Sequence, residues 1–200
     1  MLLATLAFAA PPSTTLAGER GEIAWTVSEM DSAVQINAHG PAWSVSHTAD
    51  TDGSPIHTER IAADGTLTTI DYLDWGVRVQ TGKHSIRYVA DDLWDADTID
   101  IRLATLLWTS HDTLGFRAID LADLEVHRFR AIRREVERCG SKACTRIDLT
   151  VRGSVPGQGP AWSFWYGGDG RLLRMAGVGG SFTAAPAPLE EATRPELDRR

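Results

Sequence analysis

An alternation of apolar and polar residues begins at Gly21 and continues through most of the chain. In residues 21–29, Ile23, Trp25 and Val27 alternate with polar or small side chains, and this period of two is typical of a half-buried β-strand. The alternation recurs in residues 34–36, 43–45, 77–79, 86–88, 147–151 and 162–166. Turn residues separate these segments at intervals of about 8 to 12 residues, which predicts a mainly β, antiparallel protein.

One stretch departs from this period. Ile99, Leu103 and the leucines that follow have helical spacing, so we predict one short helix at about residues 98–109. Asp97 or Thr98 is expected to cap its first turn, and the acids around them, such as Asp95, are interpreted as favouring the positive end of the helix rather than as calcium ligands. The expected fold is an antiparallel open half-barrel or a sandwich-like sheet with this short helix.

Residues 120–138 fit two patterns. Leu121, Leu124 and Val136 have helical spacing, whereas Leu124, Val126 and Val136 share one face of a strand. A long strand is favoured because the alternating segment that follows needs an antiparallel partner, and a helix remains the alternative.

The only cysteines, Cys139 and Cys144, flank a turn-forming Gly-Ser pair. We predict a disulfide that closes a strand–turn–strand unit, and such a bond suits an oxidising compartment. No further cysteine or histidine lies close in sequence, so we expect no metal site and no cofactor.

Both ends of the chain differ in composition from the middle. Residues 1–10 are predicted to be a signal peptide, with an apolar run and a small-x-small site at residues 7–9. Residues 11–20 are interpreted as a linker, residues 21–183 as a single β-rich domain and residues 184–200 as a disordered tail. The protein is therefore expected to be periplasmic or secreted.

The formal net charge of −7 argues against nucleic-acid partners, which require a basic surface. No segment has the roughly 20 apolar residues of a transmembrane helix, so no transmembrane span is expected.

Tryptophan is unusually frequent, with seven residues in the chain. Four of them lie on the apolar faces of predicted strands: Trp25, Trp43, Trp75 and Trp162. Core packing is the default interpretation of such residues, and a tryptophan-lined cleft for an apolar ligand is the functional one. These four residues are the candidates for a ligand cleft.

No nucleophile elbow or dinucleotide fingerprint occurs, so no catalytic residue is predicted. We expect a non-catalytic envelope protein that binds a lipid, an acyl chain or a hydrophobic segment of an envelope protein. The alternative is a hydrolase whose histidines and acids are far apart in sequence. The places considered for it are His84 with Asp74 or Asp91, and His111 with Asp112.

The region from Leu103 to Gly177 resembles uncharacterised bacterial periplasmic proteins in which a helix precedes a strand meander. Residues 165–174 are similar to their hairpin pattern W-x-D-x-x-G-R-L-x-R, with a glycine in place of the acid. The resemblance implies the layout of the periplasmic lipoprotein-carrier fold, an open half-barrel wrapped around a helix. It also implies a periplasmic location and, by analogy with the carriers, a role in holding acyl chains.

Overall fold

The computed structural model describes residues 13–18, 21–50, 54–90, 93–104, 111–121, 123–151, 160–177 and 180–184. Its strands in chain order are β1 Thr14–Gly18, β2 Gly21–Met30, β3 Ala33–Gly40, β4 Trp43–Asp50, β5 Pro55–Ala62, β6 Leu67–Leu73, β7 Gly76–Thr81, β8 His84–Tyr88, β9 Leu93–Asp95, β10 Thr113–Ile119, β11 Val126–Cys139, β12 Lys142–Val151, β13 Trp162–Gly167, β14 Leu172–Gly177 and β15 Gly180–Ala184. Between β9 and β10 lie a 3-10 turn, η1 Ala96–Thr98, and a short helix, α1 Ile99–Leu103.

All the described strands belong to one sheet, in the order β8-β7-β6-β5-β4-β3-β2-β1-β15-β14-β13-β12-β11-β10-β9. Neighbours in this order are mostly neighbours in the chain, as expected for hairpin connections. The pairing of β1 with β15 joins the first half of the chain to the last strand. Every pair is antiparallel except β9 with β10, which is parallel. The sheet is open, with β8 at one edge and β9 at the other.

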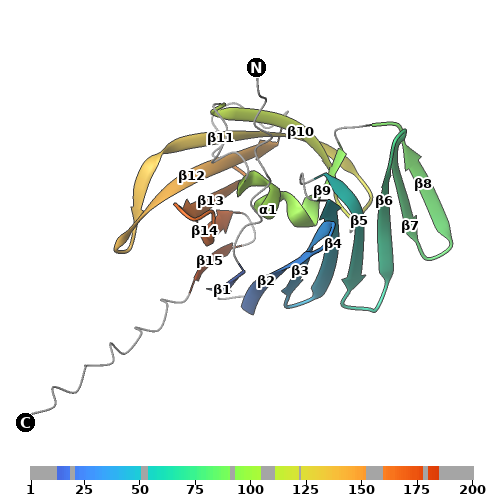
Figure 1. The fold of residues 1–200 in the computed structure, drawn as a ribbon, viewed down its shortest axis with the longest axis horizontal. Coiled ribbons are helices and arrows are strands. Elements are labelled where there is room, and N and C mark those ends of the chain that lie inside the picture. The colour runs from blue at the N-terminus through green and yellow to red at the C-terminus, as the bar shows by residue number, and fades with distance from the viewer. Residues whose placement is uncertain are drawn as a thin grey trace, which may run out of the picture.

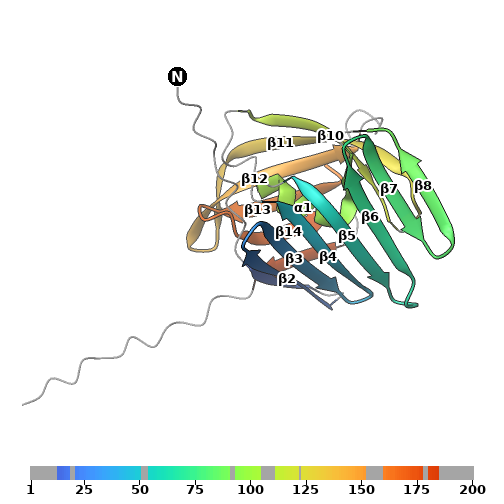
Figure 2. The ribbon, with the colours of Figure 1, turned by 45° about the vertical axis from the view of Figure 1, so that its right-hand side comes forward.

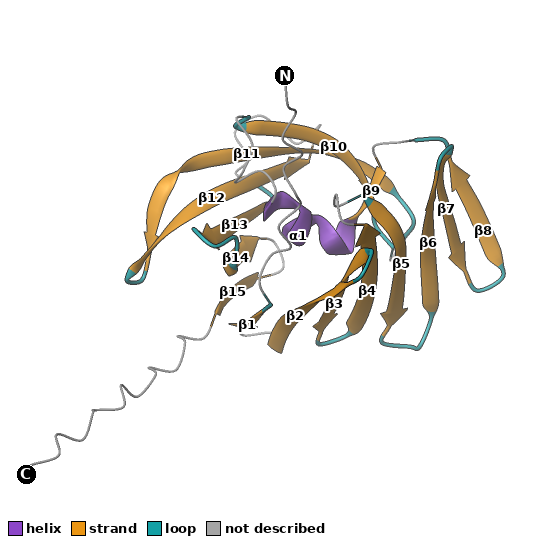
Figure 3. Cartoon of the chain, in the orientation of Figure 1, coloured by secondary structure: helices purple, strands orange, loops and turns teal. Residues whose placement is uncertain are grey.

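The sheet curves around α1, which lies on its concave side (Figures 1 and 3). Ile99 and Leu103 of this helix belong to the main core, together with inward residues of both halves of the sheet such as Trp25 and Phe164. The strands of both halves therefore enclose one apolar core, and the helix fills part of it.

Among the described residues, the two edges of the sheet meet through side chains and share no strand pairing. A second apolar cluster joins Ile70, Val77 and Val79 of β6 and β7 to Leu93 and Ile119 of β9 and β10. The Tyr88 hydroxyl at the end of β8 also donates a hydrogen bond to the Leu124 carbonyl, at 3.0 Å. Figure 2 shows β6 and β7 beside β10. We call this contact between the sheet edges the seam.

The prediction of a linker over residues 11–20 is wrong for residues 14–18, which form β1. Leu16 is completely buried between β2 and β15, where it joins the main core. The segment looked like a linker because one apolar side chain in five residues is enough for a strand whose backbone is paired on both sides. The predicted signal peptide (residues 1–10) lies outside the described residues, as does the predicted tail beyond Ala184.

The helix predicted at residues 98–109 is described only over Ile99–Leu103, because residues 105–110 lie outside the described part. Asp95 occupies the N-cap position of η1 but makes no capping hydrogen bond with its side chain. The predicted cap residues, Asp97 and Thr98, lie inside η1, and the residue at its N-cap is Asp95. In the described part of the chain, no helix has both the length and the apolar character needed to cross a membrane.

Residues 126–139 form the long strand β11, so the strand interpretation of this region is correct and the helical one is wrong. An irregularity between Arg133 and Val136 interrupts its pairing with β12. Cys139 and Cys144 form a disulfide with Cα atoms 5.8 Å apart. The two residues are diagonal, since Cys139 pairs with Lys142 and Cys144 pairs with Glu137.

Candidate binding cavity

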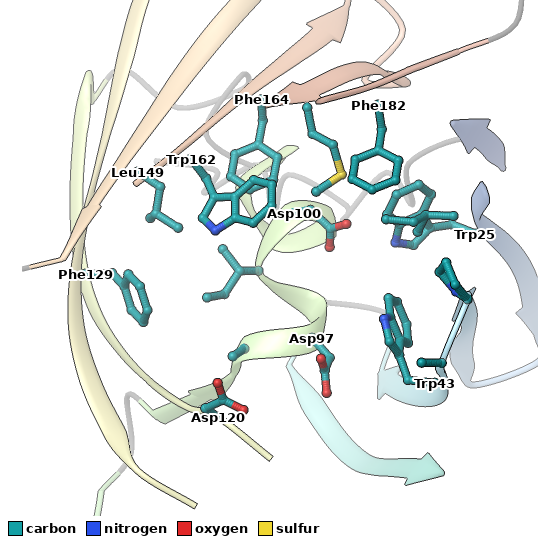
Figure 4. Close-up of a pocket in the computed structure, with 16 residues that line it drawn as sticks. Trp25, Trp43, Asp97, Asp100, Asp120, Phe129, Leu149, Trp162, Phe164 and Phe182 are labelled. Carbon is teal, nitrogen blue, oxygen red and sulfur yellow. The ribbon is translucent and has the colours of Figure 1, made fainter. Parts of the chain in front are cut away.

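A cavity of about 700 Å³ lies on the concave side of the sheet, beside η1 and α1. Its wall is mainly apolar and includes six aromatic residues: Trp25, Trp43, Phe129, Trp162, Phe164 and Phe182. Trp25 and Trp43 lie on one side of the cavity, and Trp162 and Phe129 lie on the other (Figure 4). Two distant parts of the chain thus build opposite walls of one site.

Strand alternation and two glycines place these tryptophans. Trp162 and Phe164 are two residues apart on β13, so both point inward, and their ring centroids are 6.4 Å apart. Gly177 of β14 pairs with Trp162 of β13, and a Cβ at Gly177 would lie 2.4 Å from the indole ring. Gly40 pairs with Trp43, and its Cβ would lie 2.7 Å from that ring. The two glycines leave the space that the indoles occupy.

Three acids, Asp97, Asp100 and Asp120, are the charged residues in this lining, and no basic residue of the described chain belongs to it. The Arg60 Nε atom, outside the lining, lies 3.0 Å from Asp97 Oδ2. Burial and the negative charge of Asp95 raise the pKa of Asp97 to about 6, although Arg60 partly opposes them. The polar side of the cavity therefore has an acidic character.

We expect Asp97→Asn to reduce the loss of stability with rising pH. The pKa of Asp97 is 3.8 in the unfolded chain and about 6 in the folded protein. The contribution of this raised pKa to the unfolding free energy is therefore fully present below pH 3.8 and is lost as the pH rises through about 6. The unfolding free energy of the variant relative to wild type should therefore increase by about 2–3 kcal/mol from acid to neutral pH. Urea unfolding across this range measures the difference.

Asp64→Asn is the matched control, because the pKa of exposed Asp64 is lowered by hydrogen bonds from Thr66. Its effect should have the opposite sign. A difference between Asp97→Asn and wild type that stays constant or decreases with pH would show that the Asp97 environment is wrongly described.

Trp25 has an unusual feature for a residue of this wall. Its side chain is only 3% exposed, and its indole Nε1 has no hydrogen-bond partner among the described residues. A buried donor without an acceptor costs about 1–3 kcal/mol. The nitrogen itself has almost no accessible surface, although Trp25 belongs to the cavity lining.

A buried polar network lies at the seam, next to the cavity but outside its lining. Asp95 Oδ2 accepts hydrogen bonds from the hydroxyls of Thr98, Tyr72 and Thr58 at 2.8, 3.1 and 3.2 Å. His47 Nδ1 lies 2.8 Å from Thr58 Oγ1 and 3.5 Å from Asp95 Oδ2. Because the Thr58 hydroxyl donates to Asp95, the His47 Nδ1–H donates to Thr58.

Electrostatics keep Asp95 ionised. Burial acts to raise the pKa of this carboxyl, but the hydrogen bond and charge of His47, the Thr98 hydroxyl and the charge of Arg102 together lower it. Asp95 and Thr58 are completely buried and His47 is nearly so. The network contains a histidine–carboxylate pair, as a hydrolase would need, but neither residue of the pair belongs to the cavity lining. Its arrangement suits structural bracing of β4, β5, β6 and β9.

The pairs considered for a hydrolase do not form a comparable site. His84 is exposed at the turn between β7 and β8, where it pairs with Thr81, and Asp91 lies outside the described residues. Asp112 accepts hydrogen bonds from the Arg133 guanidinium at 2.6 and 2.9 Å. His111 is exposed and precedes β10.

Of the four tryptophans proposed for a cleft, the structure brings Trp25, Trp43 and Trp162 together. Trp75 does not line the cavity. It belongs to the two-residue turn between Leu73 and Gly76, where it is 44% exposed and lies beneath the Arg87 guanidinium. The alternation that placed it on the inner face ends at this turn, because Gly76 adopts a φ of 139°.

Sequence reasoning missed the acids of the cavity and the network around Asp95. The aromatic alternation of β13 did indicate Phe164, but Phe129 and Phe182 lie on strands whose apolar pattern is weak. Among the described residues, a cluster of possible metal ligands lies elsewhere: the ligand atoms of Asp123, Glu125 and His127 are within 4.8 Å of one another. The two acids are exposed on one turn, and such groups are common without a metal ion.

Comparisons with known proteins give a likeness of fold. The sequence matches no protein-family model, and no curated protein matches it. A crystal structure of a beta-barrel-like protein of the domain of unknown function DUF1849, from Brucella abortus, is similar with a TM-score of 0.59 and 9% sequence identity. The match covers 88% of this chain and 94% of that one. This chain therefore has a mainly β, barrel-like fold that is similar to that of an uncharacterised bacterial protein.

Proposed function

We propose that this protein is an exported, non-catalytic envelope protein that holds an apolar ligand, such as a lipid or an acyl chain, in the cavity. The observation that carries the proposal is the aromatic-walled cavity of about 700 Å³ on the concave face of the sheet. Ligand sites typically enclose about 300–1,000 Å³ and combine an apolar wall with a few polar groups. This cavity has both properties.

The curvature of the sheet supports the same proposal. An open half-barrel around a helix, as in the lipoprotein-carrier layout, offers an apolar interior that a chain-like ligand can enter without unfolding the sheet. Here Trp25 and Trp43 come from the first half of the chain, and Trp162 comes from the second. A ligand between them would contact both halves and stabilise their association. A hydrophobic segment of an envelope protein is the other occupant of this class.

Export is part of the proposal. The Cys139–Cys144 disulfide suits an oxidising compartment such as the periplasm. The apolar run in residues 2–10 has the form of a signal peptide. The two features are independent, and both favour a periplasmic or secreted protein.

Lipid that co-purifies with the protein tests the proposal. We expect native mass spectrometry of protein isolated from a bacterial envelope fraction to show one lipid-sized adduct per chain, and organic extraction to release it. Trp75→Phe should retain the adduct, because Trp75 does not line the cavity. Absence of an adduct, together with failure of the extracted protein to take up added lipids, would contradict the proposal.

A further inference from the structure

Strand β8 forms an open edge of the sheet. It pairs with β7 on one side, and no other described strand pairs with its outer side. Tyr88, at the end of β8, takes part in the seam, whereas His84, Ser85 and Arg87 are exposed. Both ribbon views place the strand at the margin of the sheet (Figures 1 and 2). Its outward backbone N–H and C=O groups are therefore open to a further strand.

The inner face of this edge is apolar and incompletely covered. Ile86 pairs with Val79, which is buried in the apolar cluster of the seam, yet Ile86 itself is 36% exposed. Natural sheets commonly protect an edge with a proline, a bulge or an inward-pointing charge. Strand β8 contains no proline, its pairing with β7 is regular, and its central inward residue is Ile86. The edge therefore lacks these three protective features.

The hairpin of β7 and β8 is basic. The two strands and their turn contain Arg78, Lys83 and Arg87 and no acidic residue. Arg78 pairs directly with Arg87 on the outer face, a like-charge arrangement that disfavours the hairpin itself. Asp71 of β6 binds Arg78, whereas Arg87 lies over the Trp75 ring and has no carboxylate partner among the described residues. An acidic partner strand would supply the missing negative charge.

We propose that the free edge of β8 binds an extended segment of a partner protein, in which apolar and acidic residues alternate, by adding it to the sheet as a further strand. The apolar side chains of such a segment would cover Ile86, and its acids would lie on the outer face beside Arg87. A second copy of the chain is a poorer occupant, because its β8 would bring another Arg87 and Lys83 to the same edge. This inference goes beyond the proposed function, and no residue of β7 or β8 lines the cavity.

Fluorescence anisotropy with labelled synthetic peptides tests this inference on the purified protein. The probe is the heptapeptide Glu-Val-Glu-Val-Glu-Val-Glu, and the charge-reversed peptide Lys-Val-Lys-Val-Lys-Val-Lys has the same apolar face. We expect the acidic peptide to bind at least about tenfold more tightly, because opposite charges on neighbouring strands attract and like charges repel. Equal binding of the two peptides, or binding of neither, would overturn the proposal while the proposed function stands.

Backbone N-methylation of the acidic peptide distinguishes strand addition from adsorption on the surface. Alternate N–H groups of a strand point to opposite edges, so methylation at the valines blocks one edge of the peptide and methylation at the glutamates blocks the other. We expect one methylated form to bind like the parent peptide and the other to lose binding. Equal loss or equal retention of binding by the two forms would contradict pairing with the edge of β8.

Arg87→Glu reverses the charge at this edge. Its affinity for the acidic peptide should fall about tenfold, and its affinity for the basic peptide should rise, a gain that misfolding cannot produce. Arg138→Glu is the matched control, because Arg138 is exposed on β11 and the substitution makes the same change in net charge. It should alter neither affinity. Unchanged binding by Arg87→Glu, or the same shift in both variants, would show that the peptides do not bind beside Arg87.

Discussion

Asp95→Ala is expected to destabilise the protein by about 3–5 kcal/mol, as found when one partner of a buried ion pair is removed. Asp95 is completely buried, and one of its oxygens accepts hydrogen bonds from Thr58, Tyr72 and Thr98. Its removal leaves three hydroxyls without their acceptor inside the seam and removes the negative charge that lies 3.5 Å from His47 Nδ1. The expected loss is a large part of the 5–15 kcal/mol that typically stabilises a domain.

The location of Asp95 explains why the effect should extend beyond the site. The Asp95 carboxylate on the edge strand β9 accepts hydrogen bonds from Thr58 of β5 and Tyr72 of β6. It therefore joins one edge of the open sheet to strands near the other edge. No backbone ladder connects these described edges. Loss of the network should therefore weaken the seam as a unit, together with the apolar cluster of Val77, Val79 and Leu93.

Asp71→Ala is the control for the Asp95 substitution. Asp71 also binds a histidine and an arginine, His57 at 2.8 Å and Arg78 at 2.7 Å, but on the partly exposed outer face. Such surface pairs contribute about 0–1 kcal/mol. Urea unfolding of both variants at neutral pH measures the contrast. A loss below about 1 kcal/mol for Asp95→Ala would contradict the bracing role of the network.

Ala42→Trp is expected to weaken binding of N-phenyl-1-naphthylamine, an uncharged apolar fluorophore that serves as a ligand probe, at least about tenfold, the equivalent of about 1.4 kcal/mol. Ala42 lies on the exposed turn between β3 and β4 and belongs to the cavity lining. A large ring at this position occupies space that a ligand needs, and the exposed turn can accept the side chain without disturbing the core.

Leu67→Trp is the matched control for Ala42→Trp. Leu67 is 47% exposed at the start of β6, and it does not line the cavity. This variant adds the same type of ring to the surface, so its affinity should equal that of the wild type. Equal weakening by both substitutions would indicate that the fluorophore binds outside the cavity.

Much of the sheet could be predicted from sequence because its side chains alternate. Ile23 and Trp25 of β2 are buried, and so are Ile147 and Leu149 of β12. The turn at Gly140 also followed from local sequence, with a positive φ that glycine adopts readily. Where one face of a strand is buried and the other is solvated, local pattern and tertiary structure agree.

The seam could not be predicted, because it depends on long-range packing. Strand β9 has three residues and contains a buried aspartate, so no periodic pattern marks it. Asp95 next to other acids resembles the start of a helix, and only the distant Thr58 and Tyr72 turn it into the centre of a network. The cavity was partly foreseeable through its tryptophans, but Trp75 shows that alternation fails where a turn reverses the chain.

The most direct test of the cavity as a ligand site is a crystal structure of the protein with a lipid whose acyl chain carries a terminal bromine. The proposal predicts anomalous bromine density within the cavity, between the wall of Trp25 and Trp43 and the wall of Trp162 and Phe129. Bromine density confined to the outer surface, for example around the exposed Trp75, would contradict it, as would a cavity that stays without ligand at saturating concentration.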